Sequence, residues 1–399
     1  MDLLRRIIDN DLCLGCGICL AALGEDRGRL ELQENGYYRP LALPTTREAD
    51  KTLRAVCPGI SLRGDGRQRP LWGQTREIAV GWATDADLRE KASSGGLVSA
   101  LAIYLVEQGI CDAVLQVGPR EGHPLYNELK VSRSREEIIA NAQSRYAPAP
   151  MFPHLKTLLD QNNDSYAFVG KPCDVAALQN FLRLQSSYQP RIKAFLAIFC
   201  AGIPSYQASR QAFGQAATKA PLIALRYRGN GWPGHFQADF EDGSTLTMSY
   251  EDSWGKILGR QLGTRCKICP DGIGLLSDIA VGDAWLLKDG KPDFQAGVPG
   301  RSLALVRTER GSRWMAQALD LHYIEKGTVD PADLPLIQPY QWRRRRLSGW
   351  RALPLQCRTR FLLRFKGINL MRHSLSAGLL TGLREAVGSW KRMRKVQEK

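Results

Sequence analysis

Two apolar runs each end in a cysteine: Tyr166-Ala167-Phe168-Val169-Gly170-Lys171-Pro172-Cys173 and Ala194-Phe195-Leu196-Ala197-Ile198-Phe199-Cys200. Short apolar runs of this kind are typical of strands that are buried on both faces, as in a parallel sheet. In open α/β sheets, ligands collect in the crevice outside the carboxyl ends of such strands. The two runs therefore predict an α/β fold with Cys173 and Cys200 at a ligand-binding edge.

The segments around these runs alternate between strand-like and helix-like patterns. Residues 77–82 predict a strand, residues 97–108 an apolar-periodic helix and residues 112–117 a further strand. An Asp-Gly pair between residues 236–240 and residues 245–250 marks a β-hairpin. The predicted fold class is therefore α/β with some α+β character.

A Ser/Gly-rich turn, Ser93-Ser94-Gly95-Gly96, precedes the predicted helix at residue 97. Such a turn presents unpaired N–H groups and the positive end of the helix dipole, which suit a phosphate group. The stretch lacks both the G-x-G-x-x-G fingerprint and the Walker A lysine, so an ordinary helix cap explains it as well.

A second loop, residues 226–234, combines two arginines, two aromatic residues and three glycines. It can approach a planar anionic ligand closely, with an arginine on phosphate and Tyr227 or Trp232 against a ring. A turn-rich connection accounts for the same composition, so both interpretations stay open.

Three cysteines lie close together in Cys13-Leu14-Gly15-Cys16-Gly17-Ile18-Cys19. This spacing lets three thiolates on one tight loop reach three corners of a cubane cluster. The next cysteine occurs in Val56-Cys57-Pro58-Gly59, so we predict one 4Fe-4S cluster on Cys13, Cys16, Cys19 and Cys57. Four thiolates also suit zinc, although zinc sites usually come as two separated C-x2-C pairs.

Cys266 and Cys269 form a further C-x2-C pair. Two thiolates do not complete a cluster, and Cys173 and Cys200 could supply the other two. Asp271, which follows the pair, competes as the fourth ligand. The residues thus predict a second site whose fourth ligand stays open.

The chain has 399 residues, of which 44% are hydrophobic, and a formal net charge of +15. This size predicts two or three globular units and excludes collagen and a small disulfide scaffold. Acidic residues interrupt the apolar stretch at the N-terminus, and no run of about 18 apolar residues occurs, so we expect a cytoplasmic chain without a signal peptide or a transmembrane helix. In such a chain, clustered cysteines indicate metal or redox sites rather than disulfides.

The positive charge is concentrated at the C-terminus. Residues 340–399 hold 16 Lys and Arg against Glu385 and Glu398, a net charge of +14 that leaves +1 for the rest of the chain. Apolar residues recur at three- and four-residue steps from residue 361 to residue 390, which predicts amphipathic helices. The glycines expected to interrupt them are Gly367, Gly378, Gly382 and Gly388.

Basic amphipathic helices suit the anionic inner face of the cytoplasmic membrane, so we expect peripheral attachment through this tail. The main alternative is that the apolar stripe docks on the protein's own body. Nucleic acid is the least favoured partner, because the tail has no RNP-like aromatic motif and no zinc finger.

In combination, these segments resemble the coenzyme F420 hydrogenase/dehydrogenase β-subunit family. That family consists of iron–sulfur flavoproteins and includes F420-reducing subunits and the hydroxymethyl and vinyl chlorophyllide reductases. The resemblance covers roughly residues 10–310 in seven ordered motifs: the Cys13 run with Cys57-Pro58-Gly59, residues 91–96, Ser144-Arg145-Tyr146, residues 170–173, residues 199–205, residues 228–232, and residues 266–283 from Cys266 to Asp283.

The resemblance implies FAD in the central domain and a second 4Fe-4S cluster on Cys173, Cys200, Cys266 and Cys269. The residues implied around the flavin are Ser94, Gly95, Gly96, Tyr146, Lys171, Pro172 and Trp232, and Arg228 joins them from the loop described above. Many relatives carry a small residue where this chain has Lys171, and a cation there would stabilise a reduced flavin or a phosphate. The corresponding parts are a ferredoxin-like iron–sulfur segment (residues 1–75), a flavin-binding domain with the second cluster (76–340) and a basic helical tail (341–399).

These inferences predict an iron–sulfur flavoprotein oxidoreductase. It would take electrons from ferredoxin or another donor protein, pass them through two 4Fe-4S clusters to FAD and reduce a small-molecule or lipid-linked substrate. The candidate general acids near the flavin are Asp283, His235 and Tyr146. One alternative is an electron-relay subunit that exchanges hydride with coenzyme F420, and another is a non-catalytic iron–sulfur scaffold.

Overall fold

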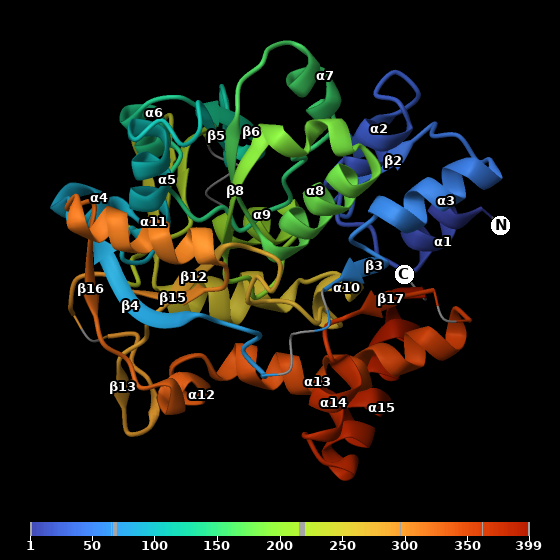
Figure 1. Ribbon diagram of the computed structural model, residues 1–399. Helices are drawn as coiled ribbons and strands as arrows, with labels where there is room; N and C mark the ends of the chain where they lie inside the picture. Colours follow the sequence, from blue (N-terminus) through green and yellow to red (C-terminus); the bar gives the residue numbers. More distant parts are fainter. Residues whose placement is uncertain are drawn as a thin grey trace.

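The centre of the molecule is a mixed sheet with the strand order β16-β4-β15-β12-β8-β7-β5-β6 (Figure 1). The computed structural model describes residues 2–64, 66, 70–214, 220–295, 297–360 and 362–397. In sheet order, the strands are Ile324–Gly327 (β16), Glu77–Ala83 (β4), Ser302–Val306 (β15), Ile279–Asp283 (β12), Ile192–Ile198 (β8), Tyr166–Gly170 (β7), Ala113–Arg120 (β5) and His123–Ser132 (β6). Strands β5, β7, β8 and β12 run parallel, and the outer strands pair antiparallel.

Helices cover both faces of this sheet. Leu97–Glu107 (α5) and Glu309–Asp320 (α11) pack on the face that carries Ala167 and Leu196, whereas Pro172–Leu184 (α8) packs on the face that carries Phe168. Because successive strand residues point to opposite faces, two covered faces require the continuous apolar runs seen in the sequence. The α/β prediction is confirmed, and the segments predicted at residues 77–82, 97–108 and 112–117 are β4, α5 and β5.

Shorter helices connect these elements. They are Ala86–Lys91 (α4), Arg135–Ala140 (α6), Leu155–Asp160 (α7), Tyr206–Phe213 (α9) and Thr264–Lys267 (α10).

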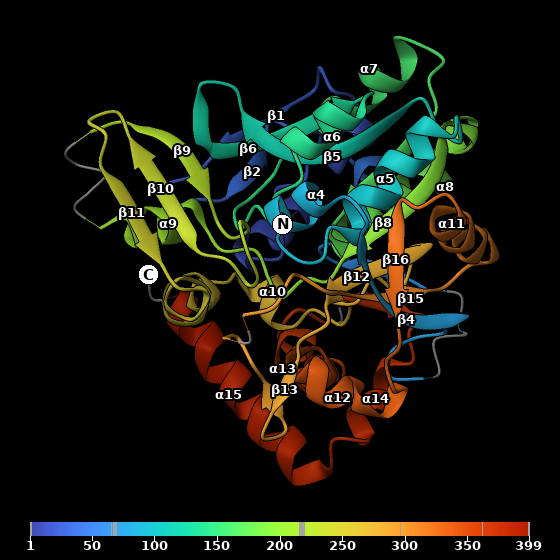
Figure 2. The same ribbon diagram turned by 90° about the vertical axis from the view of Figure 1, so that its left-hand side faces the viewer.

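A smaller sheet stands beside the main one, at the left edge of Figure 2. It contains Leu222–Arg226 (β9), Phe236–Phe240 (β10) and Thr245–Met248 (β11) in the order β11-β10-β9. The predicted hairpin is β10–β11, with Gly243 at a φ of +80° in its turn. Strand β11 ends at Met248, before the predicted end, because a π-helical segment begins at Glu251. Leu287–Lys288 (β13) and Lys291–Pro292 (β14) form a separate small hairpin.

The two terminal segments pack on each other. The N-terminal segment holds Leu3–Asp9 (α1), Ile18–Leu23 (α2), Arg29–Leu32 (β1), Tyr38–Leu41 (β2), Arg47–Val56 (α3) and Ser61–Arg63 (β3). The C-terminal segment holds Leu334–Ile337 (α12), Pro339–Arg358 (α13), Arg364–Lys366 (β17), Leu370–Leu375 (α14) and Leu379–Gln397 (α15). Strand β17 pairs in parallel with β3, and Leu3, Leu53, Leu355 and Leu363 share one apolar core.

The tail differs in part from the continuous amphipathic pattern. Residues 364–366 form strand β17 rather than helix, since they extend the N-terminal segment by pairing with β3. Phe361, the first residue of the predicted apolar pattern, lies outside the described residues. Gly367 and Gly378, with φ of +68° and +81°, separate the elements as predicted.

The expectation that Gly382 and Gly388 interrupt the helix was wrong, because both lie inside α15.

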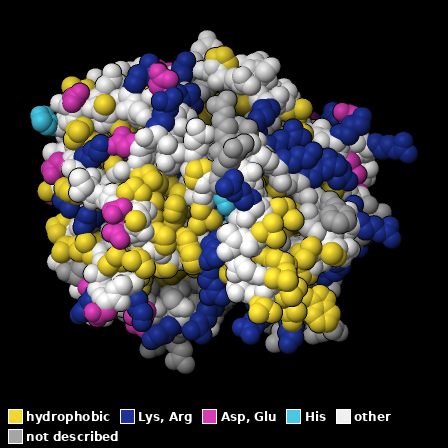
Figure 3. Space-filling model, turned by 60° about the horizontal axis from the view of Figure 1, so that its bottom comes forward, with side chains coloured by type: hydrophobic (Ala, Val, Ile, Leu, Met, Phe, Trp, Pro, Cys, Tyr) yellow, Lys and Arg dark blue, Asp and Glu magenta, His cyan; other side chains and the backbone are white. Residues whose placement is uncertain are grey.

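The apolar side chains of the tail fall into two sets, one that packs against the rest of the protein and one that stays exposed. Ile368 is buried, but seven large apolar side chains on α14 and α15 stay exposed: Met371, Leu375, Leu379, Leu380, Leu383, Val387 and Trp390. Figure 3 shows hydrophobic side chains gathered on this face, with Lys and Arg side chains beside them.

Gly382 lets α15 lie directly against α13. A Cβ at this position would overlap the Trp350 ring, whereas the nearest atoms to a Cβ on Gly388 belong to the flexible end of Arg392. We expect Gly382→Ala to lower the free energy of unfolding by about 1–3 kcal/mol, because overpacking outweighs the better helix propensity of alanine. Gly388→Ala should raise it by up to about 1 kcal/mol. Urea unfolding of both variants measures this, and equal effects would contradict the packing argument.

Candidate functional site

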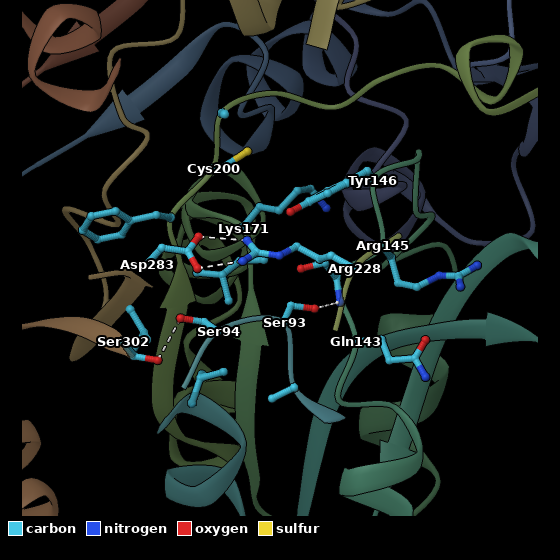
Figure 4. Close-up of a pocket in the computed structure, with 18 of the residues that line it drawn as sticks. Ser93, Ser94, Gln143, Arg145, Tyr146, Lys171, Cys200, Arg228, Asp283 and Ser302 are labelled. Atoms are coloured by element: carbon cyan, nitrogen blue, oxygen red, sulfur yellow. Dashed lines mark hydrogen bonds and ion pairs between the residues drawn. The ribbon is translucent and has the colours of Figure 1, made fainter. Parts of the chain in front are cut away.

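A cavity of about 500 Å³ lies at the carboxyl ends of three neighbouring parallel strands (Figure 4). Strand β7 leads into Lys171, β8 leads into Cys200, and β12 ends at Asp283. The Ser/Gly turn before α5 forms another wall. The edge expected from the two apolar runs therefore borders a cavity of a size usual for small-molecule sites, and Cys200 but not Cys173 lines it.

The Ser/Gly turn is fixed from two sides. Ser94 Oγ lies 3.0 Å from Ser302 Oγ, which also accepts a hydrogen bond from the Gly95 N–H at 3.0 Å. The Ser93 hydroxyl accepts from the Ser144 N–H at 2.8 Å. Among the residues that the structure describes, no side chain caps α5, whose first residues line the cavity. This arrangement favours the phosphate interpretation over an ordinary side-chain cap.

The loop of residues 226–234 is held at the sheet edge by a buried ion pair. Arg228 Nη1 and Nη2 each donate to one oxygen of Asp283 at 2.9 Å, and Trp232 Nε1 donates to Asp283 Oδ1 at 2.9 Å. Burial acts to lower the pKa of Arg228, but Asp283 raises it above its ordinary value. With these partners, Asp283 acts as an anchor for the loop, which does not favour its predicted role as a proton donor.

Aromatic side chains form much of the remaining wall. Tyr250 and Trp285 lie over the Arg228 guanidinium, with ring centroids 4.9 and 5.6 Å from its carbon. The Tyr146 ring lies 4.7 Å from that of Trp254. Flat apolar walls beside a phosphate-compatible turn suit an aromatic ligand that carries phosphate.

Lys171 is a largely buried cation at the cavity. Its Nζ lies 2.5 Å from Asp174 Oδ2 in the first turn of α8. Burial opposes its charge, but Asp174 and the thiols of Cys173 and Cys200 raise its pKa above the ordinary value. Lys171 therefore stays charged where a ligand would meet it.

The other predicted residues occupy different places. Ser94, Gly96, Tyr146, Lys171, Arg228 and Asp283 line the cavity, whereas Gly95, Pro172, Trp232 and His235 do not. Gly95 supports the turn, Pro172 begins α8, and Trp232 stacks on Trp285 with centroids 4.8 Å apart. His235 is exposed, so the structure gives it no place at the cavity as a general acid.

The first cysteine group is gathered as predicted: Cys13, Cys16, Cys19 and Cys57 line one small cavity. Burial raises the pKa of each thiol, to about 12 for Cys57. Backbone N–H groups of Gly15, Ile18 and Gly59 face the sulfurs and act in the opposite direction. A Cβ on Gly59 would lie 3.2 Å from Cys57 Sγ. Thiols that are buried (Cys16 and Cys19) or partly exposed (Cys13 and Cys57), N–H donors to sulfur and a close backbone fit an iron–sulfur cluster.

The second cysteine group is also gathered. The thiols of Cys173, Cys200, Cys266 and Cys269 interact electrostatically with one another, and burial raises the pKa of Cys200 to about 12. The Ile203 N–H donates to Cys266 Sγ at 3.4 Å. The competing ligand Asp271 instead accepts hydrogen bonds from the backbone N–H groups of Ile273 and Leu275. The donor set that fits a second cluster is therefore four thiolates.

Each group has a geometry that differs from a single-ion site. Among the described residues, no three His, Cys, Asp or Glu side chains converge on one point as a single metal ion requires. A cubane makes a different demand, because each thiolate binds a different iron.

Two family models match this chain. The coenzyme F420 hydrogenase/dehydrogenase beta subunit N-terminal model matches residues 78–156, and the C-terminal model of the same subunit matches residues 163–332. The chain belongs to this family. Cys13, Cys16, Cys19, Cys57 and the tail lie outside the matched residues.

Curated relatives carry related names. Coenzyme F420 hydrogenase subunit beta of Methanococcus voltae is 24% identical over 257 residues, 62% of this chain and 82% of the relative. The coenzyme F420-dependent sulfite reductase of Methanocaldococcus jannaschii is 22% identical over 344 residues, 81% of this chain and 49% of the relative. These relatives are oxidoreductases or their subunits, which supports an oxidoreductase role in electron transfer.

A solved structure has the same fold. One chain of the F420-reducing [NiFe] hydrogenase complex from Methanosarcina barkeri superposes with a TM-score of 0.56 at 19% identity, covering 75% of this chain and 98% of that chain. At this identity, the likeness shows the fold alone.

Several cavity residues were not predicted from the sequence. Ser302 reaches Ser94 because β15 pairs with β12 in a register that places Ser302 opposite Asp283. That register depends on the pairing of strands that are distant in sequence, so no local pattern predicts it. Trp285 carried a weaker local signal, because it lies two residues after the motif that ends at Asp283, whereas Trp254 lies in none of the motifs.

The Arg228–Asp283 pair allows a direct test of this anchor. Asp283→Asn removes the charge that compensates a buried guanidinium, so we expect the free energy of unfolding to fall by about 3 kcal/mol or more. Asp252→Asn breaks the exposed pair with Lys256 and should lower the free energy of unfolding far less. Urea unfolding compares the two, and similar losses would show that the Arg228 pair is not a structural anchor.

Proposed function

We propose that this chain is an iron–sulfur flavoprotein reductase that relays electrons from a donor protein to a ligand in the large cavity. The observation that carries the proposal is the position of Cys200, which belongs to the second cysteine group and also lines the cavity. A cluster on that group would therefore lie beside whatever the cavity binds.

The two cysteine groups are neighbours as well. Asp11 accepts a hydrogen bond from the Thr264 N–H at 2.6 Å, and the Arg265 N–H donates to the Asp11 carbonyl at 3.1 Å. The Arg265 guanidinium donates to the Pro58 carbonyl and interacts with Cys269. These contacts join the loops of Cys13 and Cys57 to the loop of Cys266 and Cys269. The order from the N-terminal segment is first group, second group, cavity.

The cavity residues suit FAD. The uncapped start of α5 would accept a phosphate, Lys171 would balance negative charge, and Tyr146 would contact a ring. Bound FAD would supply the conversion between single electrons and a two-electron hydride equivalent. Tyr146, which lines the cavity, is the general acid that we propose.

The electron donor is proposed to be ferredoxin or a similar protein that docks near Cys13 and Cys57, which are partly exposed. The names of the relatives favour coenzyme F420 as the hydride partner, which makes an F420-linked relay the second candidate function. A small organic or lipid-linked molecule remains the substrate class of the first candidate.

We also propose that the exposed face of α14 and α15 contacts an anionic membrane surface. Beside the seven exposed apolar side chains lie the exposed cations Arg372, Arg384, Lys391 and Arg392. Glu385, the single carboxylate on the described part of these helices, is paired with Arg343 and Arg351. None of the described helices is both long and apolar enough to cross a bilayer. An apolar face bordered by unpaired cations suits interfacial binding.

Cofactor analysis of the anaerobically purified chain tests the main proposal. We expect about eight irons, a matching amount of acid-labile sulfide and one FAD per chain, because each cubane holds about four irons. Zinc in place of iron would contradict the electron-transfer proposal. Iron without flavin, and without flavin reduction by dithionite-reduced ferredoxin, would favour the scaffold alternative.

Liposome flotation tests the membrane proposal. The intact chain should float with vesicles that contain phosphatidylglycerol and float less with pure phosphatidylcholine. Leu380→Glu combined with Leu383→Glu should reduce binding more than tenfold, because each buried leucine contributes about 1.5–3 kcal/mol. Ile223→Glu, at an exposed apolar residue on β9, is the control and should float normally. A wild-type chain that stays at the bottom of the gradient would overturn the proposal.

A further inference from the structure

Helix α13 directs two consecutive arginines into the protein. Arg344 is 2% exposed and Arg345 is 0% exposed, although both lie in the segment predicted as a basic helical tail. Burial lowers the pKa of Arg345 to about 10, which still leaves it charged at neutral pH. Burying a charge is costly unless it gains strong partners. The burial of these two arginines must therefore be compensated by strong hydrogen-bond partners.

Their hydrogen-bond partners are the loops of the second cysteine group. Arg344 Nη1 donates to the Cys200 carbonyl at 2.7 Å, and its Nη2 donates to the Cys266 carbonyl at 2.8 Å and the Ala201 carbonyl at 3.0 Å. Arg345 Nη1 donates to the Pro270 carbonyl at 3.0 Å, directly after Cys269. Two adjacent side chains thus tie together the chain segments that carry three of the four thiols.

The Arg344 guanidinium also has one hydrogen-bond donor that is not used by the described residues. Its Nε is buried and has no hydrogen-bond partner among the described residues. An unpartnered buried N–H is unfavourable, so this group requires an acceptor. Arg344 interacts electrostatically with Cys200, Cys266 and Cys269, so a sulfur of a cluster or of its thiolate ligands would supply such an acceptor.

The charges around the two cysteine groups are unequal. Around the second group lie Lys171, Arg265, Arg344 and Arg345, with Arg307 close to Arg345. The facing carboxylates are Asp174, paired with Lys171, and Asp271, near Arg307 and Arg345. The first group has Arg39, which is paired with Asp11, and shares Arg265. The second group therefore lies in the more positive surroundings.

We propose that Arg344 and Arg345 on α13 position the ligand loops of the second cluster and raise its reduction potential above that of the first cluster. This inference rests on the proposed function, because it requires both clusters. Reduction adds one negative charge to a cluster, and nearby cations and N–H donors stabilise that charge. With both clusters bound, an electron given up by the first cluster, which would become oxidised, would reduce the second cluster, whose ligand Cys200 lines the cavity. The C-terminal helix is thereby part of the redox centre, although it lies beyond the family models.

Redox titration of the full-length protein, followed by electron paramagnetic resonance, tests this proposal. In the wild type, the signal of the second cluster should have the higher midpoint potential, with Cys16→Ala used to assign the signal of the first cluster. Arg344→Gln should shift the second cluster to lower potential and leave the first unchanged. Arg344→Lys should retain part of the potential because it keeps the charge. Arg343→Gln, next to it on α13 but 64% exposed, should change neither cluster.

The outcomes separate this inference from the proposed function. A wild-type chain without eight irons would remove the clusters and with them the proposed function. Eight irons in the wild type and in Arg344→Gln, with unchanged midpoints, would overturn the inference alone. If Arg344→Gln loses the second cluster, the Arg344→Lys titration decides: a midpoint lower than in the wild type supports the role of Arg344, and an identical midpoint overturns it.

Discussion

The parallel pairing of β7 with β8, and of β8 with β12, brings three strand ends to one edge of the main sheet. A charged or nucleophilic side chain lies at or just after the end of each strand: Lys171 at β7, Cys200 at β8 and Asp283 at β12. Their side chains meet because neighbouring parallel strands end at the same edge, and not because they are close in sequence. The apolar strand interiors, covered by α5 and α11 on one face and α8 on the other, form the core that supports this edge.

Burial imposes a second constraint, since the charged groups at this edge must compensate one another. Asp283 is matched to Arg228, and Asp174 is matched to Lys171. Cations also lie near the cysteine thiols, but burial is the larger effect and raises the pKa of each thiol that carries a resolved shift. In the proposed clusters these groups would bind as thiolates, which would need positive charge from the cluster and from cations around it. The basic helix α13, which reaches the centre of the molecule from the C-terminus, would supply part of that charge.

Local patterns in the sequence were sufficient to predict the strands of the sheet, the β10–β11 hairpin and the grouping of the cysteines. Apolar runs indicate strands that are covered on both faces, and C-x2-C spacing indicates a loop that closes around a ligand. Contacts between distant segments left no such pattern. The pairing of β17 with β3, the register that brings Ser302 to Ser94 and the exposed position of His235 all depend on how elements pack. Arg344 and Arg345 illustrate the same limit, because four consecutive arginines look solvated until the helix is docked.

The cavity itself is preorganised. Arg145 donates to Asn127 and to two backbone carbonyls, Arg228 is paired with Asp283, and Lys171 is paired with Asp174. These cations are already held in place, so ligand binding would not have to order their side chains. The conformational entropy lost on binding would therefore be smaller. Their existing partners also limit how many can bind a phosphate directly. Recognition would then depend on the start of α5 and on aromatic faces such as Tyr146 and Trp254, which bind through shape and N–H donors rather than through free charge. A site of this kind can hold a planar cofactor next to Cys200 without bringing a mobile cation between the cofactor and the second cysteine group.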